Sequence, residues 1–469
     1  MRLLWLAAAS LAIAGSSVAL VQAQSMELVA AAIAAVLFCV FLIAAPEFWL
    51  AVLLLALVPF EALITQSLGG FGSNARQLFA MWKEALLLVG IIRVLHSNAN
   101  RRVILRSNRP VLFWSAALLL VYGATFLRIP SLAAVFSIDL ETRFLAVMLF
   151  FMLLRLDDRR RATLLRVMLW SIGSLAAYGL IQYFWDYQRL LPLVYNLPDI
   201  SFNGHRRLYS YSLDALEPAY AAMIAILIVL SGVTRSTLRV ALWWIAILLP
   251  CLLLTYTRSA YLGLLAGAAT LCIVNRTQLK RITAIGVIAS CCVCVLLLAG
   301  GDSAPEAALS RRLESIFSQN DQSSHAHKER MRKAVQVVEE NPLGIGLGKY
   351  GTVEARFAGG VSDASYTEDW ELQVAVETGV IGALAYLALT AAILISLCGR
   401  RRRKKTDSKM LVGAAIGVFA AMTVAGIMIP VWDGLLPAVY TWALVGLALN
   451  ASSGVNSSQR TKVMERSGL

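Results

Sequence analysis

The sequence predicts an all-α fold, a polytopic bundle of transmembrane helices. Hydrophobic residues make up 59% of the 469 residues, and the mean hydropathy is +0.70. Apolar runs recur along the whole chain, and many have the roughly 17–25 residues that cross about 30 Å of hydrocarbon. Long polar sequence is confined to residues 185–215 and 302–370. These three observations predict about 12–14 spans in one helical bundle with a long, helix-containing outer loop.

Fourteen apolar runs are the candidate spans. In chain order they are 4–21, 27–45, 48–66, 78–95, 110–127, 142–155, 163–184, 216–233, 239–256, 259–275, 283–300, 374–397, 410–429 and 434–450. The first run also fits a signal peptide, because VQA precedes Gln24, so its retention stays open. The run at 142–155 is short. Residues 1–451 are predicted to form a single transmembrane domain, and the polar tail 452–469 is predicted to be disordered.

The distribution of Lys and Arg predicts the orientation of the bundle. The loops 96–109, 156–166, 234–239, 276–281 and 399–409 carry 4, 4, 2, 3 and 7 basic residues. All five lie on one side if the spans alternate, and that side is expected to be cytoplasmic. Both termini are then cytoplasmic, whereas residues 185–215 and 302–370 lie outside. The net charge of +14 follows from the same rule, so the expected partners of these loops are membrane lipids and no nucleic acid.

Several kinds of site are not predicted. The seven cysteines lie within or at the ends of apolar runs, which disfavours a disulfide framework or a zinc site. The four histidines are scattered, and no Asp-x-Asp pair lies outside, so no metal is expected. The GIGLG segment at 344–348 follows a predicted helix rather than a strand, so it does not predict a nucleotide site. Its glycines are expected to allow a tight turn or a close approach to a ligand.

The long outer loop contains one amphipathic helix at 324–340. Met331, Val335 and Val338 are expected to share its apolar face, and Pro342 is expected to end it. Its first half is basic and its end is acidic, which is the order that the helix dipole disfavours. Basic residues near the N-terminus are explained if an anion binds there; a solvated helix without a ligand is the alternative.

Arginines at the predicted outer boundary are the candidate anion ligands. They are Arg143, Arg207, Arg258 and, in the long loop, Arg330. An arginine at this depth is costly unless it is paired or faces a polar cavity. Guanidinium groups bind phosphate oxygens in pairs, which suits a cationic outer pocket. The alternatives are snorkelling to the interface or salt bridges with carboxylates such as Glu141, Asp214 or Glu217.

Candidate general bases lie in the same outer loop. Glu368, Asp369 and Glu371 immediately precede the span at 374, and His327 lies on the predicted helix. A carboxylate or imidazole beside a cationic pocket can take a proton from a hydroxyl. The alternative for each carboxylate is an exposed acidic loop.

Three segments together resemble the O-antigen ligase/polymerase superfamily. TYTRSAYLGLLAG, NPLGIGLGKYG and ELQVAVETGVIGALAYL have the order and spacing of that family across residues 250–395, and RRLYSYSLDALEPAYAAMIA at 206–225 is similar to its preceding outer loop. The resemblance implies a GT-C-like glycosyltransferase of the bacterial inner membrane that needs no cofactor. Such enzymes transfer a glycan from undecaprenyl diphosphate to an acceptor hydroxyl on the periplasmic side. A flippase and a chain-length regulator are then the suggested protein partners.

The resemblance also implies roles for individual residues. The diphosphate ligands would be, in order of preference, Arg258, Arg207, Arg143 and Arg330, because the leaving group gains negative charge in the transition state. Family ligases usually carry a His-Asn pair where this chain has Glu368-Asp369. This departure favours a polymerase of O-antigen, capsule or exopolysaccharide repeats over a ligase acting on lipid A core. The general base stays open between Glu368, Asp369 and His327.

Two other functions are compatible with the sequence. One is the ligase, whose loss would leave lipid A core uncapped. The other is a lipid-linked sugar transporter, which predicts an internal repeat and charges at mid-membrane. No repeat is evident in the sequence.

Overall fold

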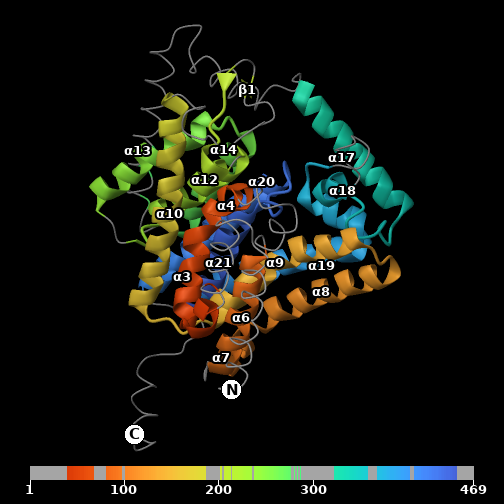
Figure 1. Cartoon of the computed structure of the whole chain (residues 1–469), viewed down its shortest axis with the longest axis horizontal. Coiled ribbons are helices and arrows are strands. Elements are labelled where there is room, and N and C mark those ends of the chain that lie inside the picture. The colour runs from red at the N-terminus through yellow and green to blue at the C-terminus, as the bar shows by residue number, and fades with distance from the viewer. Residues whose placement is uncertain are drawn as a thin grey trace, which may run out of the picture.

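The computed structural model shows a helical bundle (Figure 1). It describes residues 38–67 (except Cys39), 81–97, 101–185, 201–202, 205–212, 214–234, 237–275, 322–357, 367–401 and 406–451, with isolated positions at 279, 283 and 286. Strands in this part of the chain are limited to β1 (Ser201–Phe202) and β2 (His205–Arg206), which pair antiparallel. The predicted fold class is confirmed. The runs at 4–21 and 283–300, most of 27–45 and the tail 452–469 lie outside the described residues.

Most of the described chain forms apolar helices. They are α3 (Glu47–Leu57), α4 (Glu61–Ser67), α6 (Trp82–Ser97), α7 (Arg101–Ser107), α8 (Arg109–Arg128), α9 (Leu132–Leu153), α10 (Asp158–Phe184), α12 (Leu216–Ser231), α13 (Leu238–Leu254), α14 (Arg258–Val274), α19 (Trp370–Arg401), α20 (Thr406–Gly426) and α21 (Leu435–Ala451). The 3-10 turn η1 (Val58–Phe60) joins α3 to α4. Within the described residues, five segments are long and apolar enough to cross a membrane: Glu47–Thr65, Arg109–Arg128, Asp158–Phe184, Trp370–Arg401 and Ser408–Gly426. Helices α12, α13, α14 and α21 are shorter and apolar.

Helix α9 is longer than the short apolar run at 142–155 predicts. It begins at Leu132, where Ser131 caps it by accepting a hydrogen bond from the N–H of Ala134 at 3.0 Å. The predicted run did not include residues 132–141 because Asp139 and Glu141 interrupt the apolar pattern. In the structure Asp139 pairs with Arg143, one helical turn further along the helix. Paired charges of this kind can be accommodated inside a bundle.

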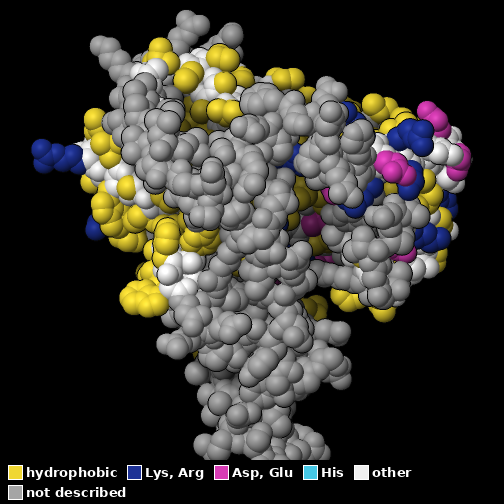
Figure 2. Space-filling model, turned by 90° about the horizontal axis from the view of Figure 1, so that it is seen from above, with side chains coloured by type: hydrophobic (Ala, Val, Ile, Leu, Met, Phe, Trp, Pro, Cys, Tyr) yellow, Lys and Arg dark blue, Asp and Glu magenta, His cyan; other side chains and the backbone are white. Residues whose placement is uncertain are grey.

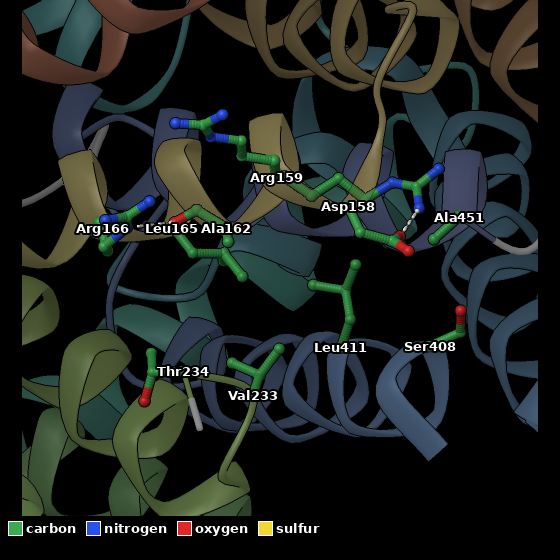
Figure 3. Close-up of a pocket in the computed structure, with 11 residues that line it drawn as sticks. Asp158, Arg159, Ala162, Leu165, Arg166, Val233, Thr234, Ser408, Leu411 and Ala451 are labelled. Carbon is green, nitrogen blue, oxygen red and sulfur yellow. Dashed lines mark hydrogen bonds and ion pairs between the residues drawn. The ribbon is translucent and has the colours of Figure 1, made fainter. Parts of the chain in front are cut away.

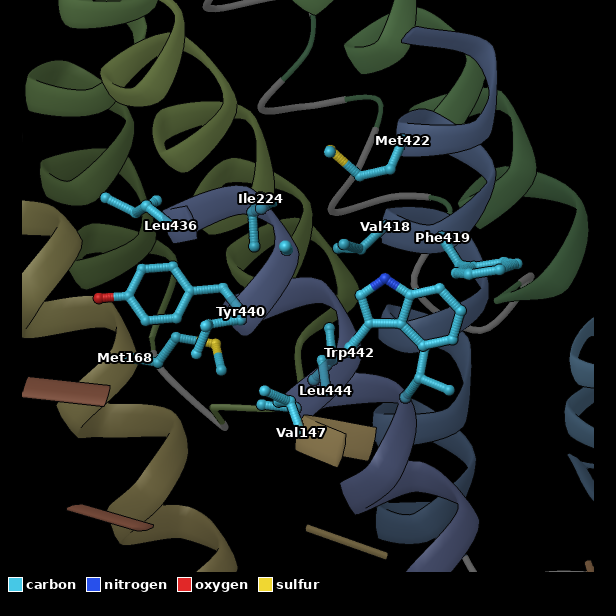
Figure 4. Close-up of a cluster of buried hydrophobic side chains, with 14 of the residues drawn as sticks. Val147, Met168, Ile224, Val418, Phe419, Met422, Leu436, Tyr440, Trp442 and Leu444 are labelled. Carbon is cyan, nitrogen blue, oxygen red and sulfur yellow. The ribbon is translucent and has the colours of Figure 1, made fainter. Parts of the chain in front are cut away.

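Helix α21 is the centre of the core (Figure 4). All residues from Leu435 to Asn450 are buried, and the helix packs against α9, α12 and α20. Figure 4 shows Trp442 and Tyr440 on α21 pointing to opposite sides, one toward Phe419 and the other toward Met168. A side chain at Gly446 would approach the Met148 carbonyl oxygen to 2.6 Å, so α9 and α21 are in backbone contact there. Small residues permit this closeness between membrane helices.

The basic loops meet at one end of the bundle. Arg400, at the end of α19, donates to the carbonyl oxygens of Ser107 and, at 3.2 Å, of Leu449. Arg161, near the start of α10, donates to the side-chain oxygen of Asn450 at 3.2 Å. These contacts join the α7–α8, α9–α10 and α19–α20 connections, as the alternating topology predicts. Which side of the membrane this end faces stays a prediction.

The predicted outer loop forms two helices, α17 (Gln322–Glu340) and α18 (Gly351–Phe357), and α17 packs against α19. The predicted helix at 324–340 is therefore confirmed, and it ends just before Pro342. Its packed face is partly the predicted one. Val338 packs against a buried cluster that includes Tyr350 and Val376, as expected, but Val335 is 42% exposed and Ala334 is fully buried in its place. The apolar pattern alone could not identify this face, because an alanine can pack closer to the partner helix than a valine.

A kink in α19 holds the glycine-rich segment. Gly379 has φ 77° and interrupts the helix, so the carbonyl oxygens of Val376 and Glu377 are available to another chain segment. They accept hydrogen bonds from the N–H groups of Ile345 at 2.9 Å and Gly346 at 3.0 Å. The GIGLG segment (residues 344–348) therefore joins α17 to the kink of α19, and we call this segment the strap.

Glycine is required in this strap for steric reasons. Gly344 has φ 79°, and a Cβ there would lie 2.4 Å from the Glu377 carbonyl oxygen. Gly348 has φ 69°, and its Cβ would lie 2.5 Å from the Ala133 carbonyl oxygen at the start of α9. The predicted tight turn is confirmed, and the close approach is to the protein's own backbone.

Candidate functional site

Three of the predicted site residues meet where α17 faces the start of α19. His327 Nδ1 lies 2.9 Å from Glu368 Oε2, and Arg330 pairs with the other carboxylate oxygen, Oε1. Each of these three side chains is between a fifth and a third exposed. The cluster is therefore accessible from outside while its members hold one another in place.

Local structure explains why these residues come together. His327 and Arg330 lie three residues apart, so they share one face of α17. The strap described above fixes α17 beside α19. His327 therefore meets Glu368, which lies forty-one residues later in the sequence. Asp369 caps α19, because its Oδ1 accepts the N–H of Leu372 at 2.8 Å. This cap places the preceding residue, Glu368, at the entrance of the helix and directed toward α17.

The pKa values of the neighbouring acids Glu368 and Asp369 are shifted in opposite directions. Burial raises the pKa of Glu368, but the His327 hydrogen bond and the charge of Arg330 outweigh burial and hold this pKa below its usual range. Burial also raises the pKa of Asp369, and the Leu372 N–H only partly offsets it, so its pKa lies above its usual range. Glu368 is thus held as a carboxylate, whereas the buried side chain of Asp369 is engaged in capping.

A second group of predicted residues lies at the turn between α13 and α14. Arg207 donates from Nε to the Thr255 carbonyl oxygen at 3.0 Å, and its Nη2 lies 3.4 Å from Thr257 Oγ1. Tyr256, between them, has φ 53°, which non-glycine residues rarely adopt. Arg258 is the first residue of α14. The strained turn therefore brings Arg207 close to the start of the helix that carries Arg258.

Arg143 belongs to a third group, inside the bundle. Its guanidinium pairs with Asp139 and, at 3.1 Å, with Glu84 on α6. Lys83 Nζ lies 3.2 Å from Glu61 and 3.6 Å from Glu84. Two carboxylates therefore pair with Arg143. They balance its positive charge, which leaves less of that charge to attract a phosphate.

Sequence reasoning missed three charged residues of this third group. Glu84 pairs with Arg143, and Lys83 pairs with both Glu84 and Glu61. Glu61, Lys83 and Glu84 lie within the apolar runs at 48–66 and 78–95. Ionisable residues inside such runs are candidates for functional sites by their position alone, and that signal could have identified them. Glu61 also connects this third group to the second group, because Glu217 interacts electrostatically with both Glu61 and Asp214.

The link continues to the second group through Asp214, which interacts electrostatically with Arg207. Burial raises the pKa of Asp214, and the Leu216 N–H and the Arg207 charge partly offset it. A line of ionisable side chains thus runs from the α13–α14 turn into the bundle. It provides the polar surroundings that make buried arginines tolerable.

The structure brings the predicted site residues together in part. His327, Arg330, Glu368 and Asp369 form one cluster, and Arg207 lies close to Arg258. Arg143 joins neither group directly among the contacts of the described residues. Figure 2 shows basic and acidic side chains gathered on the side that carries α17, while the other side is mostly hydrophobic.

Comparison with known proteins identifies a family for part of the chain. Residues 243–387 match the O-antigen ligase family, and this range includes Arg258, His327, Arg330, Glu368 and Asp369. Arg143 and Arg207 lie outside it. No curated protein matches the chain. Residues 243–387 therefore form an O-antigen ligase family domain, and the chain is a multi-pass membrane enzyme that transfers glycans, of the polymerase or ligase type.

Proposed function

We propose that this enzyme polymerises undecaprenyl-diphosphate-linked repeat units of O-antigen, capsule or exopolysaccharide on the periplasmic face of the inner membrane. The observation that carries the proposal is the contact between His327 and Glu368. Family ligases usually have a histidine where this chain has Glu368. Here the imidazole comes from α17 and is placed on that glutamate.

The contact supports His327 as the general base. An ionised carboxylate can only accept hydrogen bonds, so Glu368 fixes the proton of the neutral imidazole on Nδ1. The lone pair on Nε2 is then free to take a proton from a hydroxyl, which is the division of roles between an acid and the histidine that it orients. Glu368 is a positioning residue in this scheme. Asp369 is assigned to the helix cap.

The proposed transfer is a single displacement. His327 Nε2 removes the proton from the acceptor sugar hydroxyl, and the hydroxyl oxygen forms a bond to the anomeric carbon of the donor glycan. The bond from that carbon to the diphosphate oxygen breaks, and its electron pair leaves with the lipid diphosphate. The proton remains on the imidazole until solvent removes it.

Arginines are proposed to stabilise the departing diphosphate. Arg258 is the first candidate because it begins α14 inside the O-antigen ligase domain. Arg207 is the second, since it is anchored to the same turn. Arg330 and Arg143 pair with carboxylates, so we propose that they contribute charge balance in addition to any contact with phosphate.

The orientation is also a proposal. The convergence of three basic connections on one end supports a cytoplasmic location for that end, with both termini on the same side. The α17–α19 cluster then faces the periplasm, where the lipid-linked glycan is available.

A test in cells separates polymerase from ligase. In a strain that lacks the native protein, His327→Gln is expected to leave single repeat units on the lipid carrier, whereas the wild-type protein restores long chains. Glu329→Gln, an exposed change on the same helix, is the matched control and should restore long chains. Accumulation of long carrier-linked chains beside uncapped lipid A core would instead identify a ligase.

A further inference from the structure

A second site lies at the end of the bundle that carries the basic loops. A pocket of about 310 Å³ opens between α10, α20, the end of α21 and the turn after α12 (Figure 3). Val233, which lines it, follows α12, whereas Asp214 precedes that helix. A helix of this length separates its two ends by about 24 Å. The pocket is therefore distinct from the candidate active site.

The rim of this pocket is cationic. Arg159, Arg161 and Arg166 line it together with one acid, Asp158, so the lining carries a net charge of +2 (three arginines minus one aspartate). Arg161 is engaged by Asp158 at 2.8 Å. Arg166 is exposed, and it donates at 3.3 Å to Ala162 and Thr163 of its own helix.

Arg159 and Arg166 both border the pocket. They lie seven residues apart on α10, and therefore on one face of the helix. Arg159 is exposed, and its side chain makes no ion pair within the part of the chain that the structure describes. The helix N-terminus is already capped, since Asp157 accepts the N–H of Arg160 at 2.7 Å. The attraction for an anion therefore comes from the two guanidinium groups.

The wall of the pocket is apolar. Figure 3 shows Leu165, Val233 and Leu411 directed into the space between the helices. Hydroxyl-bearing Thr234 and Ser408 lie at its edge. A free phosphate ion would bind the arginines but would make no contact with this apolar wall. A phospholipid contacts both, because its phosphate binds the arginines while its glycerol and first methylene groups pack against the wall.

We propose that this pocket binds the phosphodiester headgroup of an anionic membrane lipid, held by Arg159 and Arg166. This site is independent of glycan transfer. The ligand chemistry is a phosphate attached to an apolar chain, and phosphatidylglycerol is the simplest probe of that class.

The test compares two double variants of the full-length protein in detergent. Arg159→Gln with Arg166→Gln removes both guanidinium groups of the pocket. Arg102→Gln with Arg106→Gln removes the same charge from α7, where both side chains are also exposed. None of these four arginines is buried, so both variants are expected to fold. A thermal unfolding measurement on each variant checks this expectation.

Binding of phosphatidylglycerol is measured by native mass spectrometry with increasing lipid. Two surface arginines contribute about 1 kcal/mol each to binding of an anionic lipid, so the pocket variant is expected to bind roughly 30-fold more weakly. The α7 variant should bind like the wild type. Equal weakening in both variants, or no weakening in the pocket variant, would overturn the proposal. Competition by millimolar inorganic phosphate as strong as that by lipid would show a free-anion site instead, and would also overturn it.

Discussion

Replacing Glu368 with Gln removes the charge that positions His327 while keeping the size of the side chain. In the wild type the carboxylate lies 2.9 Å from His327 Nδ1 and also pairs with Arg330. A hydrogen bond to a charged group contributes about 1.5–3 kcal/mol. Glu368 is 28% exposed, so solvent screens this interaction only partly. If the lost interaction supports the transition state, Glu368→Gln lowers kcat by about 10- to 150-fold.

The assay is turnover of a lipid-linked repeat unit by purified enzyme across a range of pH. We expect kcat to fall more than KM rises, because the change affects proton transfer rather than substrate binding. A structural role alone would instead lower the amount of folded enzyme and leave the kcat of the folded fraction unchanged. Wild-type turnover by Glu368→Gln would refute the assignment of His327 and Glu368.

Three further results are expected. Arg258→Lys keeps the charge but loses the paired donors, so polymer output should fall at least tenfold; unchanged output and chain length would remove it as a diphosphate ligand. Asp369→Asn should retain activity because asparagine also caps helices, whereas Asp369→Ala should lower the free energy of unfolding by about 0.5–2 kcal/mol; an inactive but stable Asn variant would favour Asp369 as the base. Gly344→Ala should lower Tm, because its Cβ would lie 2.4 Å from a carbonyl oxygen, whereas Gly123→Ala, with nothing within 4 Å, should not; equal Tm values would contradict the docking role of the strap.

The stability of the α17–α19 contact should also depend on pH. Because the pKa of Glu368 is lowered in the folded protein, its contribution is complete above the ordinary carboxyl pKa of 4.5 and is lost as the pH falls through the lowered value. Protease protection of α17 should therefore decrease in acid for the wild type and depend less on pH in Glu368→Gln. Protection that is independent of pH in both proteins would contradict the ion-pair description.

Much of the bundle could be predicted from the sequence because hydrophobic runs of membrane length form helices. The exception was α9, whose first half contains Asp139 and Glu141. Local hydropathy treats each charge as unpaired, and the pairing of Asp139 with Arg143 is visible only in the folded helix. The same limitation hid Glu61, Lys83 and Glu84, which stabilise one another across α4 and α6.

The candidate site could be predicted only as a set of residues. The sequence identified His327, Arg330 and Glu368 separately, but their meeting depends on the strap that docks on the kink at Gly379. That docking uses backbone hydrogen bonds, which leave no direct pattern in side-chain types. The glycines were the one available signal, and they predicted a tight turn without showing which segment it contacts.

The most direct test of the account uses purified full-length enzyme and one substrate, a repeat unit linked to undecaprenyl diphosphate, with no added acceptor. The account predicts products of two or more repeat units on one lipid, with release of one lipid diphosphate per bond formed, detected by mass spectrometry. His327→Gln should slow this reaction by about 10²- to 10⁴-fold, the usual contribution of a general base. Transfer that occurs only after lipid A core is added, or wild-type turnover by His327→Gln, would contradict it.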